Sequence, residues 1–170
     1  MTSAAVESSR IGGLNRAQIA RLIALLLPLA LLGGAMGSQY LGGLTPCEMC
    51  YWQRYPHAAA ILLAALSFSA PAESPRSRVL VLLAAAAIAI SGAIGVYHAG
   101  VELDIFEGLT TCTTTARGTG ADLLKEIMDA PLVRCDQVQF SFLGISMAGW
   151  NAILSLGGAV AILLLSRKPR

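Results

Sequence analysis

The sequence predicts an all-α membrane protein built as a bundle of four transmembrane helices, and two observations lead to this fold class. Hydrophobic residues make up 55% of the 170 residues and charged residues only 13%, which is more apolar surface than a soluble domain of this size can bury. Four apolar stretches each approach the ~20 residues that cross about 30 Å of hydrocarbon. They are residues 22–41, 51–70, 79–97 and 143–165, and we expect residues 1–170 to form a single integral membrane domain.

The distribution of Lys and Arg predicts the orientation of these spans. Basic residues precede the first span, separate the second from the third, and follow the fourth: Arg10, Arg16, Arg21, Arg76, Arg78, Arg167, Lys168 and Arg170. Such residues favour the cytoplasmic side, so we expect both termini in the cytoplasm. The first span can also be read as a cleavable signal peptide, and cleavage would leave the later segments on the same sides. The net charge of +2 gives no sign of a nucleic-acid partner.

The segment 99–142 is longer than a connection between two adjacent helices requires, which is typical of a functional loop. Within it, Asp122 to Asp129 places apolar residues at helical spacing along one face. This pattern predicts a short amphipathic helix that lies on the membrane surface. The predicted topology puts the loop outside the cytoplasm.

The four cysteines form two pairs on that same side of the membrane, where disulfides persist. Cys47 and Cys50 open the second span as a Cys-x-x-Cys, and a helix N-terminus favours a thiolate. Cys112 and Cys135 lie in the long loop, where a disulfide could simply staple the chain or could exchange with a partner's thiols. The first pair alone could also pack as small hydrophobic residues or bind zinc or copper. Together the two pairs favour thiol redox chemistry.

Two further side chains belong to the candidate site. Arg54 follows Cys50 by about one helical turn, so its charge can stabilise a thiolate, although an Arg near a helix end can also extend to the lipid headgroups. An Arg just inside a span calls for a partner, and we expect Cys50 or a bound anion. His98 ends the third span at the same level and is a candidate for a proton or cofactor contact, or a structural residue.

These motifs together resemble the disulfide bond formation protein B (DsbB) family over nearly the whole chain. The resemblance rests on the run Pro46 to Arg54, the segment Tyr97 to Glu102, the loop cysteine pair, and Cys135 followed by Phe142 to Met147. Their order and spacing are far more specific than any one of them. One position departs from the family, because Phe140 stands where a Trp is common, which removes an indole N–H donor.

The resemblance implies a bacterial inner-membrane enzyme that reoxidises a periplasmic DsbA-like partner of the thioredoxin fold and passes electrons to a membrane quinone, either ubiquinone or menaquinone. Cys112 would receive the attack of the partner's thiolate, and Cys135 would form an interloop bridge with Cys47. Cys50 would contact the quinone, with Arg54 stabilising negative charge. His98 and Met147 match positions near the family's quinone site, and the lipid bilayer itself would surround the bundle.

Three other functions are compatible with parts of the pattern. A quinone-linked protein of the vitamin K epoxide reductase type also uses four cysteines in a helical bundle. A membrane metal-binding protein could use the Cys-x-x-Cys, although the spans lack a convergent set of His, Asp or Glu at mid-membrane. A structural protein with two inert disulfides would show no redox turnover.

Overall fold

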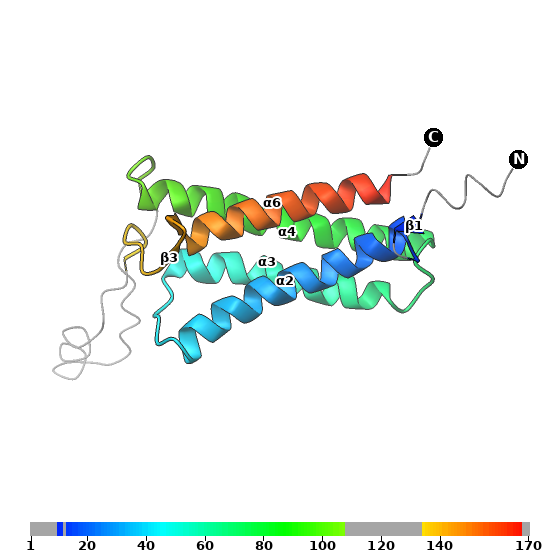
Figure 1. Ribbon diagram of the computed structural model, residues 1–170, viewed down its shortest axis with the longest axis horizontal. Helices are drawn as coiled ribbons and strands as arrows, with labels where there is room; N and C mark the ends of the chain where they lie inside the picture. The colour runs from blue at the N-terminus through cyan, green and yellow to red at the C-terminus, as the bar shows by residue number, and fades with distance from the viewer. Residues whose placement is uncertain (1–9, 12, 108–133, 168–170) are drawn as a thin grey trace, which may run out of the picture.

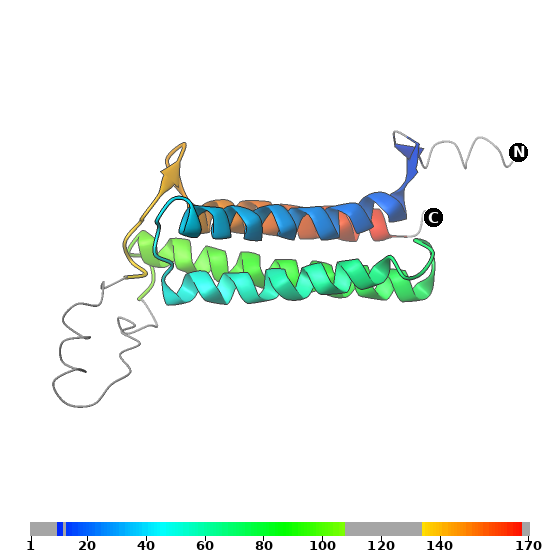
Figure 2. The same ribbon diagram turned by 90° about the horizontal axis from the view of Figure 1, so that it is seen from below.

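The computed structural model describes residues 10–11, 13–107 and 134–167, and its main elements are four long helices. They are α2 (Arg16–Tyr40), α3 (Glu48–Ser67), α4 (Pro75–Glu102) and α6 (Met147–Ser166). The helices run alternately up and down and lie side by side along their lengths (Figure 1). In the second view they form two layers, α2 with α6 and α3 with α4 (Figure 2).

Polar side chains fix where each helix begins. Asn15 caps α2 in a capping box with Gln18, whose side chain returns a hydrogen bond to the Asn15 backbone. Ser74 caps α4 immediately before a proline at the first helical position, and Ser146 caps α6 through the N–H of Gly149. At α3 the capping atom is the sulfur of Cys47. The predicted spans overlap the four helices, but only the span 79–97 lies wholly within one, because the helix ends are set by caps that hydropathy does not detect.

Three of the described helices, α2, α4 and α6, are long and apolar enough to cross a membrane. α3 is not among them, and its crossing stays a prediction. At 20 residues α3 is about 30 Å long, and Figure 2 shows it alongside α4 over nearly its whole length. α4 extends past the predicted span at both ends, so that His98 and Glu102 belong to its last turns.

Small side chains let the helices approach closely in the core. Buried alanines from all four long helices pack around Ile88 and Ile162; they are Ala20, Ala24, Ala60, Ala64, Ala84, Ala85 and Ala159. Gly95 of α4 lies directly against α6, because a Cβ built there would be 3.0 Å from the carbonyl oxygen of Ala148 and from the backbone nitrogen of Ala152. This approach brings the polar side chains of α6 within reach of α3 and α4.

Arginine side chains tie the helices together at the end of the bundle where α2 begins. Arg16 donates to the carbonyl of Leu164 at 2.8 Å, which joins the start of α2 to the end of α6. Arg21 donates to the carbonyls of Ser67 and Ala70 after α3, and its guanidinium lies over the ring of Phe68. The unpaired carbonyls at these helix ends thus receive cationic donors.

Two short antiparallel hairpins were not predicted. β1 (Arg10–Ile11) pairs with β2 (Leu14–Asn15), and β3 (Ser141–Phe142) pairs with β4 (Ile145–Ser146). The second hairpin turns through Leu143 and Gly144, both with positive φ, and this turn delays the start of α6 to Met147. The predicted amphipathic helix at residues 122–129 lies outside the described residues.

Candidate redox site

The Cys-x-x-Cys lies at the start of α3, as the sequence predicted. Cys47 caps the helix, and its Sγ accepts the N–H of Cys50 at 3.3 Å. The two sulfurs are 2.9 Å apart, so one thiol hydrogen-bonds to the other. This hydrogen bond with Cys50, followed by burial, raises the pKa of Cys47 above the ordinary value, whereas the N–H at the same sulfur lowers it. The pair is arranged to share one proton.

A third cysteine joins this pair from a distant part of the chain. Cys135, which precedes β3, lies with Cys47, Met49 and Val101 in one buried cluster. The sulfurs of Cys47 and Cys135 and a ring nitrogen of His98 all lie within 4.8 Å of one another. The thiol of Cys135 is therefore near enough to Cys47 for thiol–disulfide exchange after a small movement. Cys112 lies outside the described residues.

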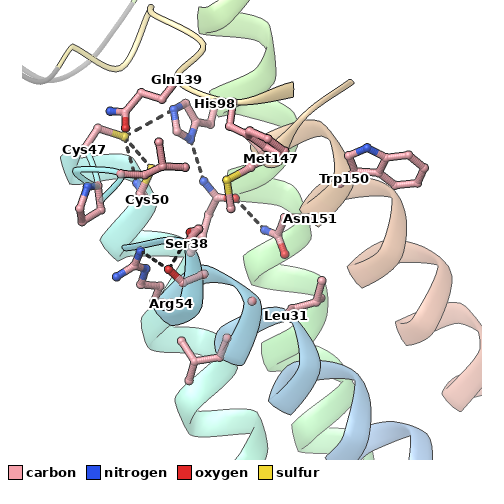
Figure 3. Close-up of a pocket in the computed structure, with 18 of the residues that line it drawn as sticks. Leu31, Ser38, Cys47, Cys50, Arg54, His98, Gln139, Met147, Trp150 and Asn151 are labelled. Atoms are coloured by element: carbon pink, nitrogen blue, oxygen red, sulfur yellow. Dashed lines mark hydrogen bonds between the residues drawn. The ribbon is translucent and has the colours of Figure 1, made fainter. Parts of the chain in front are cut away.

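His98 stands between the sulfurs and the interior of the bundle. Its Nε2 is 3.6 Å from the Cys47 sulfur and 3.9 Å from Oε1 of Glu102 (Figure 3). On the other side, Nε2 of Gln53 lies 2.7 Å from Nδ1 of the ring. The backbone of Cys135 also hydrogen-bonds the ring. The sequence identified His98 as a candidate, and the structure places its ring in contact with the Cys47 sulfur.

Arg54 lies one turn beyond Cys50, and its hydrogen bonds go to α2. The guanidinium donates to the side chain of Gln39 and, at 3.2 Å, to the carbonyl of Ala35. It also lies 5.2 Å from the centre of the Tyr51 ring. Cys50 was the expected partner, yet within the described residues Arg54 hydrogen-bonds α2 and its charge reaches Cys50 only through space.

A cavity of about 260 Å³ opens beside these residues, with apolar walls and a few polar groups. α2 contributes Leu31, Gly34, Ala35 and Ser38, while α3 contributes Cys50, Gln53, Arg54 and His57. His98 and Glu102 of α4 and Met147, Trp150 and Asn151 of α6 complete most of the lining, together with Arg134 and Phe140 from the segment before α6. Such a mixture is typical of a site for a small, mainly apolar ligand.

The residues that the resemblance placed near a quinone all line this cavity. Met147 is the first residue of α6, and Phe140 lies before β3. The indole N–H of Trp150 donates to the carbonyl of Phe142 at 3.0 Å, which holds the β3–β4 hairpin against α6. Arg134 at the rim hydrogen-bonds Asp136, which lowers the pKa of that carboxyl. Phe140, where the sequence departs from the family it resembles, also borders the cavity.

The sequence interpretation missed a network of buried polar side chains beneath the sulfurs. Asn151 of α6 donates to the Gln53 side chain at 2.7 Å and to the backbone carbonyl of Ser91 at 3.1 Å. Its oxygen is 2.8 Å from Nε2 of His57 and accepts from Ser155 at 2.9 Å. The signal was present, because polar residues recur at i, i+4 in apolar helices, as with Gln53 and His57.

Comparisons with known proteins agree with this geometry. The family model described as "Disulfide bond formation protein DsbB" matches residues 17–165. A "Disulfide bond formation protein B" from Chromohalobacter salexigens is 30% identical over 84% of this chain and 84% of its own length. A "Disulfide bond formation protein B 1" from Pseudomonas fluorescens is 29% identical over 83% and 84%. An "Uncharacterized protein RP370" from Rickettsia prowazekii is 24% identical over 84% and 83%. No solved structure matches the chain. With a family model that covers nearly its whole length, the chain belongs to the DsbB family of membrane disulfide bond formation proteins.

Proposed function

We propose that the chain reoxidises a DsbA-like periplasmic thiol oxidase and passes the two electrons through its cysteine pairs to a membrane quinone. The observation that carries this proposal is the meeting of Cys47, Cys50 and Cys135 beside one cavity. In the oxidised protein, the partner's thiolate would attack Cys112 of a Cys112–Cys135 disulfide and release Cys135 as a thiolate. Cys135 would then attack Cys47 of a Cys47–Cys50 disulfide and release Cys50 as a thiolate at the cavity wall.

The cavity has features that fit a quinone ring. Its walls are mainly apolar, which suits a lipid-soluble ring, and Cys50 and Arg54 supply a thiol and a fixed positive charge on one side. A quinone can accept the two electrons that the cysteines only pass from one pair to the next. Arg54 would stabilise negative charge at Cys50, and Met147 and His98 would border the ring.

The proposed orientation places the cysteines in the periplasm and both termini in the cytoplasm, with α3 as a fourth span. α2 begins and α6 ends at one end of the bundle, which the bond from Arg16 to Leu164 fixes, and the cysteines lie at the opposite end. Basic residues gather at the first end, as expected for a cytoplasmic face. Because α3 runs alongside α4 from end to end, it would cross the bilayer with it.

The test is quinone reduction by the purified protein with a reduced DsbA-type partner, with ubiquinone and menaquinone assayed separately. Wild type should turn over with at least one quinone, whereas Cys50→Ser and Cys112→Ser should each abolish turnover. Ser69→Ala, at the opposite end of the bundle, is the control and should match wild type. Absence of wild-type turnover with both quinones would contradict the proposal.

Metal binding is a second candidate function, favoured by the three possible ligand atoms of Cys47, His98 and Cys135. Thiolates with an imidazole suit zinc. Reduced protein that retains stoichiometric zinc after purification, and loses it in Cys47→Ser, would support this function. Quinone turnover that is unchanged by a chelator would assign the cluster to thiol exchange.

A further inference from the structure

A chain of buried hydrogen bonds connects α6 to the Cys47 sulfur. Asn151 Nδ2 lies 2.7 Å from Gln53 Oε1, Gln53 Nε2 lies 2.7 Å from His98 Nδ1, and His98 Nε2 lies 3.6 Å from Cys47 Sγ. Gln53 is 7% exposed and His98 3%, so water does not compete for these bonds. Figure 3 shows the chain as a continuous path between three helices.

Two backbone carbonyls fix the direction of every bond in this chain. A carbonyl oxygen can only accept, so the end of Gln53 that contacts the Met49 carbonyl at 3.3 Å must be its NH₂ group. The same NH₂ group contacts His98. In the same way, the Ser91 carbonyl at 3.1 Å requires the NH₂ group of Asn151, which also contacts Gln53 Oε1. The two amide orientations agree with each other.

The orientation of Gln53 determines where the His98 ring carries its proton. Nδ1 accepts a hydrogen bond from Gln53, so a neutral ring must be protonated on Nε2. That nitrogen faces groups able to accept, namely the Cys47 sulfur, Oε1 of Glu102 and the backbone of Cys135. The ring therefore presents an N–H to the sulfur.

We propose that Gln53 and Asn151 are positioning residues that hold His98 as its Nε2–H tautomer, a fixed hydrogen-bond donor to Cys47 during thiol exchange. This inference deepens the proposed function and rests on it for the exchange step. In that step the Cys135 thiolate attacks Cys47 Sγ, the Cys135–Cys47 bond forms, and the Cys47–Cys50 bond breaks with its electron pair on Cys50. His98 stabilises the charge spread over the sulfurs and keeps its proton.

Several charged or titratable groups also line the cavity or pack beside the Cys47 sulfur. α3 contributes Cys50, Arg54 and His57, α4 contributes Glu102, and the segment before α6 contributes Cys135 and Arg134. The described α6 residues at the cavity are neutral. A readout specific for the His98 ring nitrogens is therefore needed to separate the tautomer from the surrounding charges.

The tautomer can be measured directly by ¹⁵N NMR of histidine-labelled protein in detergent. The chain has only two histidines, so His57→Gln assigns the His98 signals. Wild type should show Nε2 protonated and Nδ1 bare. Gln53→Glu replaces the donor by an acceptor and should protonate Nδ1, whereas Gln39→Glu, a charge-matched control on α2, should leave the His98 tautomer unchanged. A wild-type ring protonated on Nδ1 would overturn the proposal, even if the variants did not fold.

The effect of His98 on the Cys47 sulfur is measured in a protein that keeps Cys47 as its only cysteine, with the other three replaced by Ala. A hydrogen bond from His98 stabilises the charged thiolate of Cys47, which is the form that reacts. His98→Phe should therefore slow alkylation of Cys47 at pH 7 about tenfold. Gln53→Leu should slow it by a smaller factor, since the ring then divides between tautomers. Equal rates in all three proteins would refute the donor role. If wild type has the expected His98 tautomer but shows no quinone turnover, the positioning role of Gln53 and Asn151 is supported. The proposed function is then the part that is rejected.

Discussion

Replacement of Asn151 by Leu should lower the free energy of unfolding of the bundle by more than the loss of one hydrogen bond would. Leu preserves the approximate volume but removes every hydrogen bond of the amide. The NH₂ group bonds Gln53 at 2.7 Å and the Ser91 carbonyl at 3.1 Å, and the oxygen accepts from His57 at 2.8 Å and Ser155 at 2.9 Å. All of these partners are held inside the bundle.

The magnitude follows from the number of these bonds and from the groups left behind. Hydrogen bonds between membrane helices average about 0.6 kcal/mol, so the three of these bonds that join Asn151 to α3 and α4 contribute about 1.8 kcal/mol. Asn151→Leu also leaves the buried Gln53 oxygen without its present partner, which adds a desolvation cost of about 1 kcal/mol or more if nothing replaces Asn151. His57 Nε2 keeps a second partner, the Ser91 hydroxyl at 2.9 Å. We expect a loss of about 2–4 kcal/mol in the free energy of unfolding.

The assay is reversible unfolding in mixed micelles, followed by circular dichroism. Ser155→Ala is the matched control, because it removes only the bond of the network that lies within α6 and should cost about 1 kcal/mol. If Asn151→Leu and Ser155→Ala were equally stable, the network would not hold the helices together, and the reasoning from its contacts would be refuted.

Three further outcomes are expected. Gly95→Ala forces a Cβ to within 3.0 Å of the α6 backbone and should lower the unfolding free energy by about 1–3 kcal/mol; Gly37→Ala meets nothing within 4 Å, so a comparable loss there would rule out the packing explanation. In the reduced protein, the raised pKa of Cys47 keeps this thiol protonated as the pH rises, so its alkylation midpoint should lie above 9.0. Cys50→Ala removes the first cause of that shift and should move the midpoint down; an unchanged midpoint would contradict the shared proton. Under the proposed function, Arg54→Gln should raise the KM for quinone about tenfold with a smaller change in kcat, and an unchanged KM would place Arg54 outside the quinone site.

The sequence predicted the parts of the fold that depend on local pattern. Apolar stretches of about 20 residues located all four helices, and the Cys-x-x-Cys was correctly expected at a helix N-terminus. The helix ends were less accurate, because they depend on single capping residues such as Asn15 and Ser146, which hydropathy averages out. The β3–β4 hairpin was missed because a two-residue strand has too few residues to show an alternating pattern.

Contacts between distant residues could not be predicted in the same way. The partners of Arg54 lie on α2, and a spacing rule along α3 can only suggest Cys50. Likewise, the approach of Cys135 to Cys47 joins residues far apart in the sequence, which no local pattern specifies. The resemblance to a family supplied that pairing as an expectation, and the geometry is consistent with it.

The depth of the cavity bears on how its occupant would be supplied. Its wall runs along α2 from Ser38 to Leu31, which is about 10 Å along the helix axis. A molecule that fills this space lies among acyl chains, so its mole fraction in the lipid, and not its aqueous concentration, governs occupancy. Diluting proteoliposomes with buffer should then leave saturation unchanged, whereas diluting the same membranes with additional phospholipid should reduce it.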